Sequence, residues 1–598
     1  MRTSIATVSL SGTLEEKLRA AAAAGFDGVE VFEDDLVASP LSPEEVRALA
    51  RELGLGIELY QPLRDLEALP AERFEDGLRR ARHTFRLMNR LGAPTLLVCS
   101  NCSAEAVDDD ALAAEQLRRL AEVAADHGVR IAYEALAWGR HVNDELHAWR
   151  IVAAADHPGL GLCLDSFHVF SRGRDPGAIR RIPGEKIFFV QLADALRPSA
   201  DVREWGRHHR RFPGEGDFDL AAFVVAVLAA GYRGPLSLEV FNDVFRQADP
   251  RHVAVHARRS LLALEERLNL RPLPPPAEVR GWAQVEVEVD ERTAPAAAAM
   301  LASLGFTRAA RHRARRVDLW RQGDIQILLR AGRSGRARGA VPRLSALGLR
   351  SADPERTARR ARALLAPPRA GPEPEAVELV APDGTSVRLY PADRVQPWPE
   401  GFHPLPGPDG PDAGLDHIDH VELGQRPGRF EPTLFFFRSV LGLEMEAGEE
   451  LTTPEGLIRG RSVSSPAGEA RVAFTVPLVG GGGPVGQHVA FACSDIFATA
   501  RRLRTLGARI LPIPDNYYLR LAAGGELEPE LLQGMREHGI LYDRDPQGGS
   551  LFHLYTLPLG RRLCFEVLQR VGGYRGLGAA NALIRWTAQR APATRAGR

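Results

Sequence analysis

Short apolar runs alternate with amphipathic helical stretches across residues 1–270, and this alternation restricts the fold more than any other feature. Several helical stretches follow a Ser, Thr or Asp and end in Gly, as helix termini do. A strand followed by a helix brings the next strand into the same sheet in parallel. The strand-like runs are SIATVSL (4–10), GVEVF (28–32), GIELY (56–60), TLLVCS (95–100), RIAYE (130–134), LGLCLD (160–165), IFFVQ (187–191) and LSLEV (236–240).

Eight strand-helix units in this length match the size and repeat count of a (β/α)8 barrel. A doubly wound sheet is the alternative, and it is less favoured because no Gly-rich phosphate-binding turn follows the first strand. We therefore expect an α/β TIM barrel over residues 1–270.

The composition excludes several classes of protein. At 598 residues the chain is too long for one compact domain. A net charge of -1 gives no electrostatic footprint for nucleic acid or an anionic membrane surface. No apolar run approaches the ~20 residues that cross a bilayer, and the first residues do not form a secretory signal. We expect a cytoplasmic protein with no nucleic-acid or membrane partner.

Two Pro-rich segments divide the rest of the chain. We expect linkers at 271–279 and 398–414, which leave modules at 280–397 and 415–585 and a flexible tail at 586–598. Both modules show a strand, then a helix, then further strands. This repeated order predicts an α+β region that is built from two copies of one unit.

Four polar residues end consecutive strands of the expected barrel: Glu134, Asp165, Gln191 and Glu239. The carboxyl ends of barrel strands converge, so these side chains are expected to lie close together. Three converging carboxylates repel one another unless a cation lies between them. A set of oxygen donors suits a hard divalent ion such as Mg²⁺ or Mn²⁺.

Further polar residues follow the same strand ends. A loop over residues 205–220 is rich in His and Arg, and guanidinium groups match the geometry of a carboxylate substrate. The only lysines, Lys17 and Lys186, lie away from this end of the barrel, which argues against Schiff-base chemistry. The candidates near the barrel mouth are Tyr60, Gln61, Arg64, His168, His208, His209 and Arg210.

The motifs YQPLRDLE, CLDSFH, QLADA, RFPGEGDFDL and LEVFND resemble those of sugar-isomerase-like metal barrels, and within that group those of bacterial 3-dehydroshikimate dehydratases. The resemblance covers residues 1–268. It implies dehydration of 3-dehydroshikimate to protocatechuate through a metal-stabilised enolate, in quinate and shikimate breakdown. The implied metal is Mg²⁺, Mn²⁺ or Co²⁺, and the implied ligands are Glu134, Asp165, Gln191 and Glu239.

The remaining barrel residues take expected roles in this reaction. His168 and Arg210 are the catalytic candidates, His168 by transferring a proton. Arg64 and Arg210 are expected to hold the substrate carboxylate, and Tyr60 to orient a ring hydroxyl. Gln61 and His209 complete the predicted substrate-binding set.

The second module carries its own candidate site. His420, His488 and Glu566 lie on separate strand-like runs, and two imidazoles with one carboxylate can form a facial triad on a divalent metal. Residues 280–585 resemble 4-hydroxyphenylpyruvate dioxygenase, which implies Fe²⁺ or Mg²⁺ there. The chain departs from that family at His553, and at Leu577 and Ala582, where aromatic residues are usual. We therefore expect no turnover of 4-hydroxyphenylpyruvate.

Two other enzyme classes stay open at this point. A ketose isomerase or epimerase would use the same barrel metal without losing water, although the Arg-rich loop favours a carboxylate substrate. A dioxygenase would use the C-terminal triad, with the barrel as a scaffold. The C-terminal region is also expected to support assembly of a homo-oligomer.

Overall fold

The computed structural model describes residues 1–196, 201–332, 342–393, 401–406, 412–446, 448–453, 456–478, 486–560 and 562–590. The chain divides into two compact units, Met1–Leu273 and Pro274–Arg598. Among the helices of the described ranges, none combines the length and the apolar character that crossing a bilayer requires.

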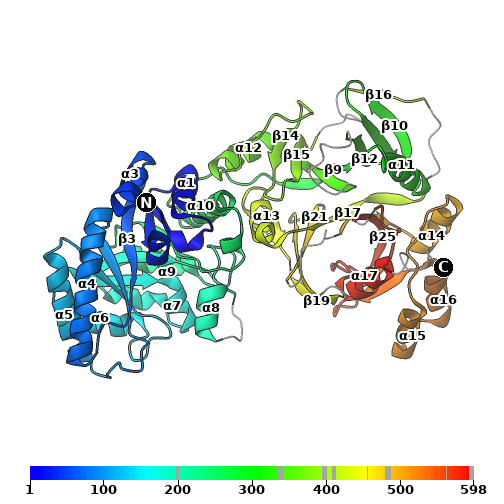
Figure 1. Ribbon diagram of the computed structural model, residues 1–598. Coiled ribbons are helices and arrows are strands. Elements are labelled where there is room, and N and C mark those ends of the chain that lie inside the picture. The colour runs from blue at the N-terminus through cyan, green and yellow to red at the C-terminus, as the bar shows by residue number, and fades with distance from the viewer. Residues whose placement is uncertain are drawn as a thin grey trace. The chain divides into compact units, whose positions relative to one another are not determined.

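The first unit is a closed barrel whose parallel strands pair in chain order, which confirms the predicted (β/α)8 fold (Figure 1). A 3-10 turn over Thr7–Ser9 follows the first strand, which is therefore shorter than expected. The strands are β1 (Thr3–Ala6), β2 (Gly28–Phe32), β3 (Gly56–Leu63), β4 (Thr95–Cys99), β5 (Arg130–Glu134), β6 (Leu160–Asp165), β7 (Ile187–Leu192) and β8 (Leu236–Leu238).

Helices surround the barrel (Figure 1). They are α1 (Leu14–Ala23), α2 (Glu33–Val37), α3 (Pro43–Glu52), α4 (Ala71–Leu91), α5 (Asp110–Ala125), α6 (Glu145–Ala155), α7 (Ser166–Ser171), α8 (Val202–His208), α9 (Leu220–Ala229) and α10 (Pro250–Arg267). Local sequence fixes several of their starts. Thr13 with Glu16 forms a capping box at α1, and Ser42 with Glu45 forms another at α3.

Alternation along the strands decides which side chains fill the barrel. An inner apolar cluster contains Leu59, Leu97, Cys99, Ala132, Leu136, Cys163 and Phe189. Neighbouring strand residues such as Val98 and Tyr133 pack outward in the larger core. Glu134, Asp165 and Gln191 each follow an inner residue by two positions, so their side chains also point inward, at the carboxyl end of the barrel.

The second unit contains two mixed sheets. The first sheet has the order β14-β15-β13-β9-β12-β11-β10-β16. Its elements are β9 (Val279–Val289), α11 (Ala294–Ser303), β10 (Thr307–His312), β11 (Val317–Gln322), β12 (Ile325–Ala331), β13 (Arg343–Ser351), α12 (Pro354–Ala363), β14 (Val377–Val380), β15 (Ser386–Pro391) and β16 (Phe402–Pro404).

The second sheet has the order β18-β20-β21-β17-β22-β25-β24-β23, with β19 paired to β20. Its strands are β17 (Leu415–Gly424), β18 (Glu444–Met445), β19 (Glu449–Thr453), β20 (Gly456–Ser464), β21 (Arg471–Pro477), β22 (Gln487–Cys493), β23 (Leu541–Arg544), β24 (Ser550–Tyr555) and β25 (Leu563–Val571). Its helices are α13 (Pro427–Ser439), α14 (Ile496–Thr505), α15 (Asp515–Gly524), α16 (Pro529–His538) and α17 (Ala582–Arg590).

The two sheets repeat one pairing pattern. In the first sheet, β9 runs parallel to β12 and antiparallel to β13, and β13 runs parallel to β15. In the second sheet, β17, β21, β22 and β25 stand in the same relations. The α+β region is therefore a two-copy repeat, as predicted.

Two expected irregular segments contain regular structure. Within the expected linker 398–414, β16 pairs antiparallel with β10, because β10 offers an open edge for hydrogen bonding. Residues 586–590 of the expected tail belong to α17, whose Arg585 and Ala588 are buried. The rest of that tail, 591–598, lies outside the described residues.

Candidate functional site

Three carboxylates from different strands meet at the carboxyl end of the barrel. Glu134 ends β5, Asp165 ends β6 and Glu239 directly follows β8. Each residue is at most 4% exposed. Asp165 is also held by the chain, because its Oδ1 accepts from the backbone N–H of Phe167 over 2.8 Å at the start of α7. The strand ends therefore bring together three of the four predicted ligands.

Burial and mutual repulsion disfavour the charged forms of these carboxylates. Burial, with the charges of Glu239 and Asp165, raises the pKa of Glu134 well above its ordinary value. Burial raises the pKa of Glu239 to about 7. Oε1 of Glu134 is buried and has no hydrogen-bond partner within the part of the chain that the structure describes. A cation bound between these carboxylates would offset their repulsion and stabilise their charged forms.

Arg210 lies within the same cluster and is 2% exposed. Its Nη1 donates to Asp165 Oδ2 over 2.7 Å and to Glu239 Oε2 over 2.9 Å. Its Nε donates to the carbonyl oxygen of Gly206 over 2.8 Å, and Phe167 lies against its guanidinium. These bonds hold Arg210 to the carboxylates. Its Nη2 lies 3.4 Å from His168 Nε2, and the expectation that Arg210 binds the substrate carboxylate stays a prediction.

His168 faces the cluster from α7. Its Nε2 lies 3.8 Å from Glu134 Oε1 and 3.6 Å from Asp165 Oδ2. Ligand atoms of these three residues lie within 4.8 Å of one another, a grouping that could hold a metal ion. The backbone N–H of Ala137 donates to His168 Nδ1 over 3.0 Å. Burial and the charge of Arg210 lower the pKa of His168, which favours the neutral ring, and its Nε2 lies 3.4 Å from Arg210 Nη2.

Gln191 contacts a fourth buried carboxylate, Glu30 of β2. Its Nε2 donates to Glu30 Oε2 over 2.6 Å, and Gln61 donates to the same oxygen over 2.8 Å. Ser237 donates to the other oxygen of Glu30. The Oε1 of Gln191 accepts from the Cys163 thiol over 3.2 Å. Glu30 was missed by sequence reasoning, although a carboxylate between two outward-facing valines in GVEVF is a signal for an inward-facing acid.

Tyr60 does not join the cluster. Its neighbours Leu59 and Gln61 point into the barrel, whereas Tyr60 packs in the outer core, because successive strand residues face opposite sides. Its hydroxyl donates to Glu33 Oε1 over 3.4 Å. The structure therefore places Tyr60 away from the carboxylates, and the substrate contact expected for it stays a prediction.

Three candidates from the barrel remain, Arg64, His208 and His209, and the first and last of them are exposed. Arg64 follows β3 directly, and its charge acts on the Cys99 thiol of the inner cluster. His209 is exposed and forms a backbone bridge with Asn242. Its neighbour His208 pairs with Asp243 at 3.0 Å. Arg64 is therefore a cation near the barrel mouth, while His208 is held to the loop after β8.

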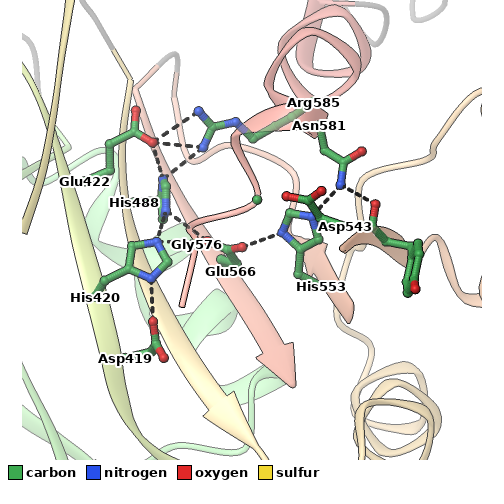
Figure 2. Close-up of polar contacts among 12 residues, drawn as sticks. Asp419, His420, Glu422, His488, Asp543, His553, Glu566, Gly576, Asn581 and Arg585 are labelled. Atoms are coloured by element: carbon green, nitrogen blue, oxygen red, sulfur yellow. Dashed lines mark hydrogen bonds and ion pairs between the residues drawn. The ribbon is translucent and has the colours of Figure 1, made fainter. Parts of the chain in front are cut away.

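A second cluster joins β17, β22 and β25 in the second unit (Figure 2). The Nε2 atoms of His420 and His488 lie 3.1 Å apart. Glu566 Oε2 lies 3.3 Å from the first and 2.9 Å from the second. Glu566 is fully buried, and although burial opposes this, contact with the two imidazoles holds the pKa of its carboxyl well below the ordinary value. Two imidazole nitrogens and one carboxylate oxygen thus face a common point, and the three residues form a grouping that could hold a metal ion.

Other side chains fix the orientation of each member of this triad. His420 Nδ1 lies 2.8 Å from Asp419 Oδ1, and His488 Nδ1 lies 3.2 Å from Glu422 Oε2. His553 Nδ1 lies 2.6 Å from Glu566 Oε1. The acceptor on Nδ1 of His420 leaves its Nε2 to face a metal, whereas Nδ1 of His488 lies between Glu422 and Arg585 Nη1, which is 3.0 Å away. Such outer partners are typical of metal sites. His553, a departure from the resembled family, therefore orients Glu566.

A cavity of about 640 Å³ adjoins the triad and is lined by His420 and His488. Arg585 of α17 borders it, donating from Nη1 to Glu422 Oε2 over 3.2 Å (Figure 2). A volume of this size is within the range of small-molecule sites.

Strand register shows why only one repeat carries the triad. His420 pairs with Ala490, which pairs with Glu566. The matching row of the first sheet is Gln284, Gly348 and Arg388. Arg388 thus stands where Glu566 stands in the second repeat, and it donates to Glu286 Oε2 over 2.9 Å. A buried ion pair takes the place of a metal ligand there.

Comparison with known proteins covers the whole chain. It is 43% identical to a 3-dehydroshikimate dehydratase of Pseudomonas putida, with 98% of each chain aligned. It is 44% identical to a 3-dehydroshikimate dehydratase of Pseudomonas aeruginosa, again over 98% of each. The chain belongs to the 3-dehydroshikimate dehydratase family. The family assignment agrees with the resemblance of residues 1–268.

Each part of this dehydratase-family chain also matches a family model. Residues 18–264 match the xylose isomerase-like TIM barrel, and residues 274–395 match the N-terminal part of hydroxyphenylpyruvate dioxygenase. Residues 415–550 match the glyoxalase/bleomycin resistance protein/dioxygenase superfamily. A solved xylose isomerase-like TIM barrel/4-hydroxyphenylpyruvate dioxygenase fusion protein is 41% identical, with a TM-score of 0.88 over 98% of this chain and 99% of its own.

Proposed function

We propose that the barrel converts 3-dehydroshikimate into protocatechuate and water with the help of a divalent metal ion. The full-length similarity to two 3-dehydroshikimate dehydratases supports the reaction. The convergence of Glu134, Asp165 and Glu239 supports the metal. The unpartnered, buried Oε1 of Glu134 carries most weight, because a buried acceptor without a donor implies a missing partner.

The donor set fits a hard cation. Glu134, Asp165 and Glu239 would hold it through carboxylate oxygens, and Gln191 through its amide oxygen, a set that suits Mg²⁺, Mn²⁺ or Co²⁺. Such an ion supplies positive charge next to the substrate oxygen on which negative charge develops. Loss of the proton next to the ketone and of the hydroxyl one carbon further on releases one water, and enolisation then completes the aromatic ring.

His168 is proposed to act as a hydrogen-bond donor. Its Nδ1 accepts from the chain at Ala137, so the neutral ring offers Nε2–H to a substrate oxygen. A neutral histidine can stabilise a developing oxyanion in this way. This role replaces the proton transfer expected from the sequence, because a second ring proton would point at the Ala137 N–H.

Arg210 and Arg64 were both expected to hold the substrate carboxylate, and we propose that they have different roles. Arg210 neutralises part of the charge on Asp165 and Glu239 and so opposes the burial that raises their pKa values. Arg64 is exposed beside the barrel mouth and is available to a substrate carboxylate.

Product identification tests the proposal. The full chain with Mn²⁺ is incubated with 3-dehydroshikimate, and the products are separated and identified by mass. We expect the parent chain to form protocatechuate, which is lighter than the substrate by one water, about 18 Da. We expect Glu239→Ala to form none, because the metal would lose a ligand. A product of unchanged mass would instead establish an isomerase, and no reaction at all would refute the proposal.

We also propose that His420, His488 and Glu566 bind a second divalent ion, Fe²⁺ or Mg²⁺. The convergence of the two Nε2 atoms on Glu566 Oε2 and the three orienting partners support it. Metal analysis of the full chain should find one ion fewer per chain after His420→Ala and His488→Ala. Equal metal content would refute this second site.

A further inference from the structure

Arg471 is the cation closest in register to the C-terminal triad. It begins β21 and pairs directly with His420 of β17. Paired residues on neighbouring parallel strands point to the same face of the sheet, with strands about 4.8 Å apart. Arg471 and His420 both line the cavity beside the triad. A guanidinium therefore lies next to the candidate metal on one cavity wall.

The guanidinium nitrogens of Arg471 are not all hydrogen-bonded. Its Nη1 donates to the carbonyl oxygen of Arg575 over 3.0 Å, whereas its Nε is buried without a hydrogen-bond partner among the described residues. The paired carboxylate, Glu446 Oε1, is 3.9 Å from that Nε. Burial and the charges of Arg570 and Arg575 lower the pKa of Arg471. An anion that enters the cavity would satisfy this guanidinium.

The wall next to Arg471 is built of small side chains. Register places Ser464 beside Arg471, and Ser462 beside Ala473. All of these residues line the cavity. The rings of Tyr555 and Trp586 also line the cavity. A lining that combines small polar groups with aromatic rings suits a flat ring with polar substituents.

We propose that this cavity binds an aromatic carboxylate with two neighbouring hydroxyl groups, the hydroxyl oxygens at the triad's metal and the carboxylate at Arg471. A facial triad leaves neighbouring positions open, which two adjacent oxygens can fill. Arg471 gives the carboxylate a charge-assisted partner. Protocatechuate belongs to this class, so the expectation that the chain makes such a ligand rests on the function proposed for the barrel.

Calorimetric titration with added protocatechuate tests the site in the full chain loaded with Mn²⁺. Glu134→Ala is included to remove binding at the barrel. We expect Arg471→Gln to weaken the remaining site about 10- to 100-fold, as loss of a charge-assisted bond does. Catechol, which lacks the carboxylate, should bind equally well with and without Arg471. Arg459→Gln is the matched control, because Arg459 pairs with Glu450 and does not line the cavity.

Three results would overturn the inference: no binding in the Glu134→Ala background, no loss with Arg471→Gln, or an equal loss for catechol. Circular dichroism confirms that each variant is folded, and Arg471→Met replaces Arg471→Gln if the latter unfolds. The ligand is supplied, so the titration does not depend on the barrel. A chain that binds protocatechuate here but does not dehydrate 3-dehydroshikimate would refute only the proposed function.

Discussion

The guanidinium of Arg210 lies 2.7 Å from Oδ2 of Asp165, so a buried cation of the chain already stands among the carboxylates of the barrel. Both side chains are at most 2% exposed. This ion pair distinguishes Arg210 from Arg64, although the sequence suggested the same role for both arginines. Arg210 belongs to the carboxylate cluster, whereas Arg64 is exposed.

Arg210→Ala is expected to destabilise the metal-free barrel by about 3–5 kcal/mol, because it leaves buried carboxylates without their partner. Mn²⁺ should restore part of the loss by supplying charge to the same oxygens. Thermal unfolding with and without Mn²⁺ measures both effects. Arg64→Ala is the control: it should unfold like the parent chain and raise KM for 3-dehydroshikimate. Parent-like stability of metal-free Arg210→Ala would contradict this account.

His168 should be replaceable in part by a side chain that donates a hydrogen bond. His168→Ala is expected to lower kcat about 10²- to 10³-fold, the usual effect of removing one oxyanion donor. His168→Gln should recover some of this loss, since its amide can donate from a similar place. Both variants should keep the barrel metal. Loss of metal in His168→Ala would instead make His168 a ligand, as its distance to Glu134 allows.

Glu67 makes stability depend on pH. Burial raises its pKa to about 7, while its Oε1 accepts from Asn101 N–H over 2.6 Å and from Tyr133 over 3.0 Å. The folded state therefore keeps a proton that the unfolded chain loses near its ordinary pKa of 4.5. The free energy of unfolding should fall as pH rises through this window, by about 1.4 kcal/mol per unit, and level off above pH ~7.

Glu67→Gln keeps the accepting oxygen and removes the titration. We expect a flatter stability profile between pH ~4.5 and ~7, and a variant more stable than the parent above it by up to about 3 kcal/mol. Urea unfolding across the pH range measures this. Parallel profiles for the two proteins would show that Glu67 does not titrate in this window.

The C-terminal triad should be dispensable for dehydration. The residues proposed to hold the barrel metal lie before residue 240, and the triad residues lie after residue 415. Changing His420, His488 and Glu566 together to Ala should leave kcat/KM for 3-dehydroshikimate within about twofold, the scatter expected of remote sites. The intact chain should consume no oxygen with 4-hydroxyphenylpyruvate and Fe²⁺. A collapsed rate in a folded triple variant, or oxygen uptake, would be inconsistent with separate sites.

The sequence predicted what depends on local pattern. Regular strand ends located Glu134, Asp165 and Glu239, because the strand period fixes which residues face inward. Tyr60 and Gln61 were both expected in the site, but the same period makes their side chains face opposite sides of the strand. The same strand period could also have predicted that Glu30 faces the inside of the barrel.

Other features depend on contacts distant in sequence. The partners of Arg210 come from β6 and from the residue after β8, and β16 pairs with β10, about ninety residues earlier (Thr307–His312 against Phe402–Pro404). Nor does local pattern reveal that Arg388 occupies the row of Glu566, since this follows from strand register. Such relations arise only when the sheet is assembled.

The central claim is that the barrel carboxylates bind the metal on which dehydration depends. The direct test follows protocatechuate absorbance after 3-dehydroshikimate is added to metal-free chain, and then to chain titrated with Mg²⁺, Mn²⁺ or Co²⁺. We predict no product without metal and a rate that rises with the ion in the parent chain and in the triple triad variant. Folded Glu134→Ala and Glu239→Ala should stay inactive at every concentration. Full activity of the metal-free chain, or metal-restored activity in both glutamate variants, would contradict the account.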